Sequence, residues 1–550
     1  MSDSAVVIPP VRGYLGGEDG HRSFFGGTIS KQRLWSVGLS IGLGLLLTLL
    51  FQWVGLLIML VSTVASFILT TKTHRGSIVE RRRKRRRWKA RVQTGTDTYQ
   101  PYTVAAWDQA EEAARQAKGR RARWQAARQL AAIRLMPDGA DGMGWLQKGR
   151  RQPGIAWHSP NGEAPYLSVA FSVSGMLRGI ESPDKLNGGT IAFSKFLAEL
   201  AGPESLARNV QTVTRIVPSD TALYEFWARN HVDGAIPEEA KASYREVLRL
   251  TSEHAMVQRH FVVVSWPITA QFINAAEKYG NARDGWRSLM DAEIAQTVKK
   301  LTGARLGAVD ALTARQVAAV LTHLQNPGHP IEYVAGVDPT SFGVPSHDEF
   351  SATVTEGTGP NGEPVQWWHR TAKISAGGLS TGARTPLWLL PVLVGTHLQM
   401  IRTLSFHHHL VLGVEAKAAA TKDLVRDEAR KISDAEAGHL ADDTTQVAAN
   451  AAAQRLADFR PGNGHEGDYW IGYLTISETS RDRLAQACRL VQSICHSKAG
   501  IERIEWLDSY QSAAAGTTWP IGRGIRSIRA STSAKVYRRL AGRSQKDELT

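Results

Sequence analysis

Few residues in this 550-residue sequence combine a type and a spacing that could do chemistry. His407, His408 and His409 form the one cluster of metal-ligand type. On a strand, the first and third imidazoles would share a face and the second would point away, and a third ligand is missing at a useful spacing. We interpret these histidines as polar residues on a half-exposed strand, and we predict no metal and no cofactor.

The glycine-rich stretch 377–385 is the nearest approach to a phosphate-binding loop. Such a loop needs GxxxxGK followed by Ser or Thr, but this stretch has no lysine and no clear flanking strand and helix. The sequence also contains no HExxH or CxxC pattern. Trp367 and Trp368 could stack on a base, yet on a strand they point to opposite faces, so at least one is expected in the core. We predict that the chain is not an enzyme.

The element that must position everything else is the apolar stretch Leu34–Thr71, which contains no charged side chain. It is about 38 residues long, nearly twice the roughly 20 that one membrane helix needs. Gln52, Trp53 and Gly55 in its middle suit a turn at the membrane surface. The stretch therefore predicts a two-helix transmembrane hairpin, rather than one long tilted span or a signal peptide.

Basic residues flank both ends of this stretch, and its middle carries no charge. The positive-inside rule then places both termini in the cytoplasm and only the turn outside, which predicts two spans in the cytoplasmic (inner) membrane. Seven consecutive basic residues follow. We predict that this basic collar contacts anionic lipid headgroups, with nucleic acid as the alternative. The seven are Arg81, Arg82, Arg83, Lys84, Arg85, Arg86 and Arg87.

Composition favours folded domains, because 43% of the residues are hydrophobic. The net charge is +15, and much of the excess lies in residues 75–134 and 523–543. Such blocks indicate contacts with anionic lipid or nucleic acid rather than a particular fold. Cys488 and Cys495 fall on one predicted helix, about 10 Å apart and too far for a disulfide, so we predict small buried residues.

A long helix rich in alanine and arginine is predicted at Ala106–Leu135. Its surface is too arginine-rich for an ordinary core helix. We therefore predict that it stacks on neighbouring subunits or runs along the membrane. The candidate subunit contacts are Trp107, Arg120, Arg121, Arg123 and Trp124.

Changes in composition and periodicity divide the chain. We predict a membrane-anchored α+β protein, with strands and helices layered in two cytoplasmic domains. The predicted parts are a cytoplasmic arm at 1–33, the hairpin at 34–71, basic juxtamembrane helices at 72–138, a glycine-rich linker at 139–154, a first α+β domain at 155–325, a linker at 326–365, a second α+β domain at 366–522 and a basic tail at 523–550.

The second domain is predicted to be ferredoxin-like. Read from the strand Arg402–Leu412, it alternates β-α-β-α-β. A long alanine-rich helix, Ala416–Phe459, is the first crossover. The strand Asp468–Ser477 and the helix Arg481–Ser497 follow, and Ile501–Leu507 is the last strand.

Four stretches carry a family resemblance. Together with the apolar N-terminal stretch, they make the chain similar to actinobacterial membrane proteins encoded with conjugative type IV secretion systems. These proteins join a PrgI-like two-span N-terminus to a region similar to the N-terminal, non-ATPase part of the TraC/TrbE/CagE class of conjugation ATPases. The stretches are PLWLLPVLV at Pro386–Val394, RTLSF at Arg402–Phe406, DYWIGYLTIS at Asp468–Ser477 and SAAAGTTWPIGRG at Ser512–Gly524.

The resemblance implies a non-catalytic structural subunit that docks a separate motor ATPase and other channel subunits, because the ATPase module of the relatives is not found in this sequence. Further copies of the chain are expected partners, as a homo-oligomer. Two alternatives stay open. The chain also resembles EccE-type subunits of type VII secretion, which share a two-span entry and a basic cytoplasmic body. It could instead be a membrane-tethered nucleic-acid-binding protein that uses residues 81–87 and 523–543.

Overall fold

The structure is a computed structural model of the 550-residue chain. It describes residues 13–15, 31–71, 77–160, 164–175, 181–219, 227, 230–231, 236–252, 255–359, 362–380, 382–395, 398–413, 415–418, 420–421, 425, 453–454, 456–458 and 466–524. Most of the predicted arm 1–33, the body of the predicted helix Ala416–Phe459 and the predicted tail 523–550 after Gly524 lie outside these residues.

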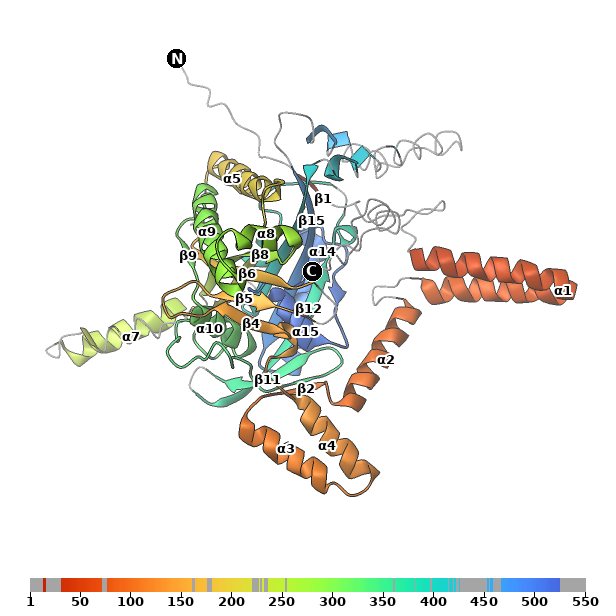
Figure 1. Ribbon diagram of the computed structural model, residues 1–550, viewed down its shortest axis with the longest axis horizontal. Helices are drawn as coiled ribbons and strands as arrows, with labels where there is room; N and C mark the ends of the chain where they lie inside the picture. Colours follow the sequence, from red (N-terminus) through yellow and green to blue (C-terminus); the bar gives the residue numbers. More distant parts are fainter. Residues whose placement is uncertain are drawn as a thin grey trace, which may run out of the picture.

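The protein is an α+β protein built on one large mixed sheet (Figure 1). The strands follow the order β3-β2-β10-β11-β12-β15-β14-β7-β8-β6-β5-β4, and β9 and β16 add to β6 and β12. Every pair in this sheet is antiparallel except the parallel pair β2 and β3. Both predicted α+β domains therefore contribute to the same sheet.

The first half of the sheet contains a group of four strands in which β6 lies between β8 and β9, and β8 lies between β6 and β7. The strands β4 and β5 precede this group and extend it as a meander. In chain order the elements are β4 (Met143–Gln147), β5 (Ile155–His158), β6 (Tyr166–Val173), α5 (Pro183–Ala201), β7 (Asn209–Pro218), α7 (Glu238–Ser252), β8 (Met256–Pro267), α8 (Ala270–Glu277), α9 (Ala282–Gly303), β9 (Val309–Ala311) and α10 (Ala314–Gln325).

The second half repeats this order. Here β12 lies between β15 and β16, and β15 lies between β12 and β14, while β10 and β11 precede the group as a meander. In chain order the elements are β10 (Ser346–Asp348), β11 (Thr353–Thr358), β12 (Pro364–Ile374), η2 (Ala376–Gly378), β13 (Gly382–Arg384), α11 (Leu390–Leu393), β14 (Ile401–Val411), β15 (Gly467–Glu478), α14 (Arg481–Lys498), β16 (Glu505–Trp506), α15 (Gln511–Ala515) and η3 (Gly516–Thr518).

The two halves meet where β7 pairs with β14, in a register that runs from Arg402 opposite Ile216 to His409 opposite Asn209. Each of these strands is the second strand of its group. Because two equivalent strands pair antiparallel, an approximate two-fold axis relates the halves at this seam. Residues Ser512–Gly524 cross the seam, where Gln211 donates to the Trp519 carbonyl and accepts from the Gly522 N–H.

Alternating residues of the strands face two apolar layers, as a pleated strand requires. In β8, Val262 and Val264 belong to the core under α5 and α9, whereas Phe261 and Val263 belong to the core under α10. In the second half, Leu474 and Ile476 of β15 pack in the core that α14 covers. Both cysteines are buried in α14, as predicted. Burial raises the pKa of Cys488 to about 11 and that of Cys495 to about 12.

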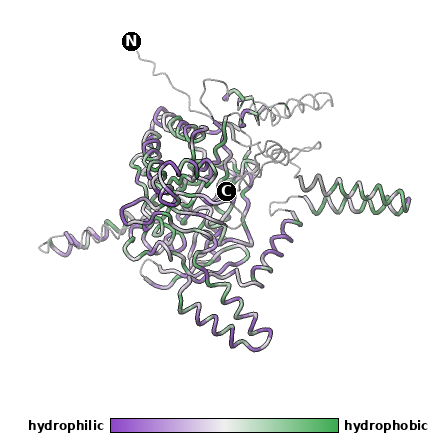
Figure 2. Tube along the Cα trace, viewed as in Figure 1, coloured by the Kyte–Doolittle hydropathy of each residue, from purple (hydrophilic) through white to green (hydrophobic). Residues whose placement is uncertain are grey.

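The N-terminal helix α1 (Lys31–Thr70) extends away from this body as an apolar rod (Figures 1 and 2). Its residues Ser36–Thr70 are long and apolar enough to cross a membrane. Phe51 and Gln52 have non-helical backbone angles, with φ of 44° at Gln52. The segments on either side of this break lie against each other, with the hydroxyls of Ser40 and Ser66 2.7 Å apart.

Several predicted boundaries are wrong. The predicted single helix Ala106–Leu135 is two helices, α3 (Val104–Gln116) and α4 (Arg120–Ala132), because Gly119 adopts a φ of 91° that turns the chain. The predicted linker 139–154 contains β4, and the predicted linker 326–365 contains β10 and β11. These strands were missed because they are short and rich in glycine or polar residues.

The predicted start of the second unit is also wrong. The strands β14 and β15 are antiparallel neighbours, so the connection between them does not join parallel strands, as the predicted first crossover would require. The first strand of the group is β12, and the segment with α11 connects it to β14. Short elements complete the fold at its edges: β1 (Gly13–Leu15) pairs with β13, and β2 (Thr98–Pro101) pairs with β3 (Ile133–Arg134). The turn η1 (Asp138–Ala140) precedes β4.

Candidate membrane-proximal basic surface

The predicted basic collar forms the helix α2 (Ile78–Thr94), which starts seven residues after Thr71 at the end of α1. Ser77 caps this helix: its hydroxyl accepts from the Glu80 N–H, and the Glu80 carboxylate accepts from the Ser77 N–H. The helix ends at Gly95 with a φ of 77°. A Cβ on Gly95 would lie 2.6 Å from the Arg128 backbone, so glycine is required there for α4 to approach.

One side of α2 contacts the body. Lys84 donates to the Trp506 carbonyl at 2.8 Å, and the Trp88 ring packs edge-on against Phe350 with 6.4 Å between centroids. Arg91 continues the same side. The spacing of 84, 88 and 91 is that of one helix face, so the body binds α2 along nearly two turns.

Arg91 makes the strongest of these contacts with the body. Its guanidinium pairs with Asp348 at 2.5 Å and with Asp138 at 3.3 Å, and it lies 3.8 Å from the centre of the Tyr510 ring. Ser512 donates to both carboxylates. Burial raises the pKa of Asp348 although the Arg91 charge opposes this, so the arginine is needed to keep a carboxylate at that position.

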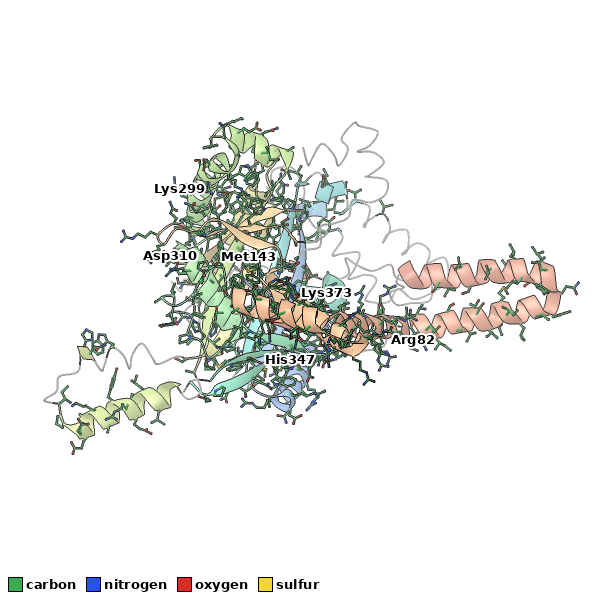
Figure 3. All side chains as sticks on the ribbon, turned by 60° about the horizontal axis from the view of Figure 1, so that its bottom comes forward. Arg82, Met143, Lys299, Asp310, His347 and Lys373 are labelled. Atoms are coloured by element: carbon green, nitrogen blue, oxygen red, sulfur yellow. The ribbon has the colours of Figure 1, made fainter. Side chains whose placement is uncertain are left out.

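The other side of α2 is exposed. Of the seven basic residues predicted to contact lipid or nucleic acid, only Lys84 is turned toward the body. Figure 3 shows Arg82 on the part of α2 that is nearest to α1. The six exposed members are Arg81, Arg82, Arg83, Arg85, Arg86 and Arg87. We call these six residues the outer arginines.

The helices α3 and α4 form a hairpin beside α2 (Figure 1). All five predicted subunit contacts are exposed: Trp107 on α3, and Arg120, Arg121, Arg123 and Trp124 on α4. Trp124 also anchors the hairpin, because its indole N–H donates to the Gln93 carbonyl of α2 at 3.0 Å. The Arg128 guanidinium lies over the ring at 5.0 Å, and Trp124 is 45% exposed.

Sequence reasoning treated the basic run as uniform and missed its division. The contacts of Lys84 and Arg91 depend on residues more than 250 positions away, such as Asp348 and Trp506. The sequence did contain a signal of a bound side. The spacing of Lys84, Trp88 and Arg91 is that of one helix face, and one of the three is aromatic.

The three consecutive histidines have separate partners. His407 is buried and contacts the Thr517 carbonyl at 2.8 Å, His408 pairs with Asp468 at 2.6 Å, and His409 contacts Asn209 at 2.7 Å. Within the described ranges, no group of three His, Cys, Asp or Glu side chains is placed to hold a metal ion. In the glycine-rich stretch, Arg384 donates to the carbonyls of Ala499 and Gly500.

The comparisons with known proteins add no relative: no protein-family model matches the chain, and no curated protein matches its sequence.

Proposed function

We propose that this chain is a non-catalytic structural subunit of a membrane-embedded secretion machine of the conjugative type IV kind. It presents a cytoplasmic body that docks a separate motor ATPase, other channel subunits and further copies of itself. The observation that carries the proposal is α2. A basic helix starts directly after the apolar α1 and is bound to the body through Lys84, Trp88 and Arg91, so the outer arginines stand beside the membrane segment.

In this proposal α1 forms two transmembrane spans in the cytoplasmic membrane. Each half has about 20 residues and a length of roughly 30 Å, which matches the hydrocarbon core. Gly44 and Gly55 support a close approach of the two halves, since a Cβ on either would clash with Met59 or with the Leu47 backbone. The positive-inside rule then favours a cytoplasmic α2, whose outer arginines contact anionic headgroups.

Single cysteines test this topology. Native Cys488 and Cys495 are buried with raised pKa values, so their background labelling is low. We expect an impermeant maleimide to label Trp53→Cys in intact cells and Thr94→Cys only after permeabilisation. Labelling of Thr94→Cys from outside would contradict the topology.

Affinity purification of the full chain in mild detergent tests the assembly. We expect a motor ATPase and other membrane subunits to remain bound after a salt wash and to be identified by mass spectrometry. The variant R120Q/R121Q/R123Q should lose subunits that bind the α3–α4 hairpin. The matched control R82Q/R83Q/R86Q removes the same charge from α2 and should retain them. Recovery of the chain alone from both the parent and the control would refute the assembly.

A membrane-tethered nucleic-acid-binding protein is the second candidate, favoured by the six outer arginines that the body leaves uncovered. In that case DNA affinity should fall steeply with salt. R82Q/R83Q/R86Q should then reduce the slope of log affinity against log salt by roughly 3, because each lost phosphate contact removes about 0.9. An unchanged slope in this variant would exclude α2 as the DNA site. An EccE-like type VII subunit differs from the first proposal only in which partners co-purify.

We also infer that residues 366–522 contain a ferredoxin-like unit. The order β16-β12-β15-β14 supports this, because it separates the first and second strands by the third, as a split β-α-β arrangement does. The order β9-β6-β8-β7 supports the same inference for the first half.

A further inference from the structure

A small cavity lies beside the seam between the two halves, on the side that Ser512–Gly524 cross. Its walls come from both halves, from α10 and from the residues after β16. The side chains relevant to binding are those of Arg215, Gln325, Thr355, His369, Thr475 and Thr518. Neither Asp nor Glu lines the cavity among the residues that the structure describes.

Arg215 of β7 is the charged group of this cavity, and only 1% of it is exposed. One terminal nitrogen donates to the Thr403 hydroxyl at 2.8 Å, and the other is 3.4 Å from the His323 carbonyl. Its Nε–H has no hydrogen-bond partner among the described residues. A buried cation with one strong hydrogen bond and an unused donor is costly unless an anion pairs with it.

Arg402 of β14 is the other fully buried arginine near the seam, and its hydrogen bonding differs from that of Arg215. Its guanidinium donates to the carbonyls of Val392, Leu393, Leu398 and Met400 at 2.7 to 3.1 Å. No ligand is needed at Arg402, because backbone oxygens satisfy each of its nitrogens. At Arg215, by contrast, the Nε–H has no acceptor among the described residues.

The neighbouring groups leave the positive charge uncompensated. Burial, with a smaller contribution from the Arg215 charge, lowers the pKa of both His323 and His369 to about 3. Burial also lowers the pKa of Arg215, to about 9, which still leaves it protonated at neutral pH. The cavity therefore combines one cation with neutral imidazole, amide and hydroxyl groups, a set that suits an anion.

We propose that this cavity binds a small inorganic anion, which pairs with the Arg215 guanidinium and accepts from its Nε–H. Residues of β7, β12 and the segment after β16 would then meet around one charge. The bound anion would stabilise the seam between the two halves.

Thermal unfolding of the full chain in detergent tests the proposal, with chloride and phosphate each titrated at constant ionic strength against gluconate. We expect one of the two anions to raise Tm by about 3 °C or more between about 1 and about 100 mM. Arg215→Met should abolish the rise. Arg259→Met is the matched control, because Arg259 lies opposite Arg215 on β8 but pairs with Glu332, and it should keep the rise.

Thr403→Val provides a second test that leaves the charge in place. It removes the hydroxyl that orients the Arg215 guanidinium, and it should weaken the apparent anion affinity by about fivefold or more. The proposal is overturned if neither anion raises Tm of the parent protein, or if the rise persists in Arg215→Met. If Arg215→Met does not fold, an unchanged affinity in Thr403→Val overturns it.

Discussion

The two halves of the sheet connect their strands in the same order but make the first connection differently. In the first half, α5 leads from β6 to β7, and its 19 residues satisfy most of their own backbone hydrogen bonds. In the second half, the described residues of the connection from β12 to β14 contain the short turn η2, the three-residue strand β13 and the four-residue helix α11, and no longer helix. Arg402 satisfies the carbonyls that this short segment leaves unpaired.

The difference between these two connections shows that one strand order can be stabilised by two kinds of interaction. A helix connection depends on apolar burial, since Phe196 and Leu200 of α5 are 2% and 3% exposed. A short irregular connection depends on one side chain with several donors, because buried carbonyls must find a partner. The halves should therefore respond differently to different substitutions.

Arg402→Met, in the second half, should be the most destabilising of these substitutions. It leaves four buried carbonyl oxygens without their donor, so we expect a loss of about 4 kcal/mol in the free energy of unfolding, measured by denaturant titration in detergent. Arg402→Lys, which keeps the charge but cannot reach all four oxygens, should lose less. A loss below about 1 kcal/mol in Arg402→Met would show that the Arg402 hydrogen bonds do not stabilise the connection.

Phe196→Ala tests the apolar connection of the first half. Phe196 is buried in the core with Leu167 and Val264, so the cavity should cost about 3 kcal/mol in the free energy of unfolding. Ile191→Ala on the same helix is the control, because Ile191 is 60% exposed and its loss should cost little. Equal losses in the two variants would contradict the role assigned to α5.

Gln211→Leu tests the seam that joins the halves. Gln211 is 1% exposed, donates to Ser405 and Trp519, and accepts from the Gly522 N–H. Leaving these groups unpaired should cost about 2 kcal/mol. Hydrogen exchange should then increase in the segment after Ser512. Exchange confined to β7, with that segment unchanged, would show that the segment is bound by other contacts.

Acid should weaken both halves through buried histidines. Burial is the main cause that lowers the pKa of His158 in the first half and of His369 in the second to about 3, against about 6.5 when unfolded. The unfolded chain therefore binds more protons between these values. Stability is full above about pH 6.5 and falls toward pH 3, by up to about 1.4 kcal/mol per pH unit for each histidine.

His369→Gln should reduce the pH dependence of the free energy of unfolding by the contribution of about one histidine. Denaturant titrations between about pH 4 and about pH 6 measure this dependence. His231→Gln, at an exposed position, is the control and should leave the slope unchanged. A slope that does not change in His369→Gln would mean that His369 is protonated in the folded protein.

Local patterns predicted much of the fold. The predicted strands Arg402–Leu412 and Asp468–Ser477 are confirmed as β14 and β15, since runs rich in apolar, aromatic and β-branched residues favour strands wherever they are placed. The predicted helix Arg481–Ser497 is confirmed as α14. The short strands β4, β10 and β11 escaped prediction, because they are short, and their glycine and polar residues give little strand signal of their own.

By itself, the sequence determined that the chain has an apolar N-terminal helix, a basic helix after it and an α+β body, because hydrophobicity, charge and periodicity are local properties. Only the tertiary structure decided that the two halves share one sheet and that α2 has a bound and an exposed side. It also decided that Arg402 is satisfied while Arg215 keeps an unused donor. The physical reason is the same in each case: pairing, burial and the partner of a charge depend on residues that are hundreds of positions apart in the sequence.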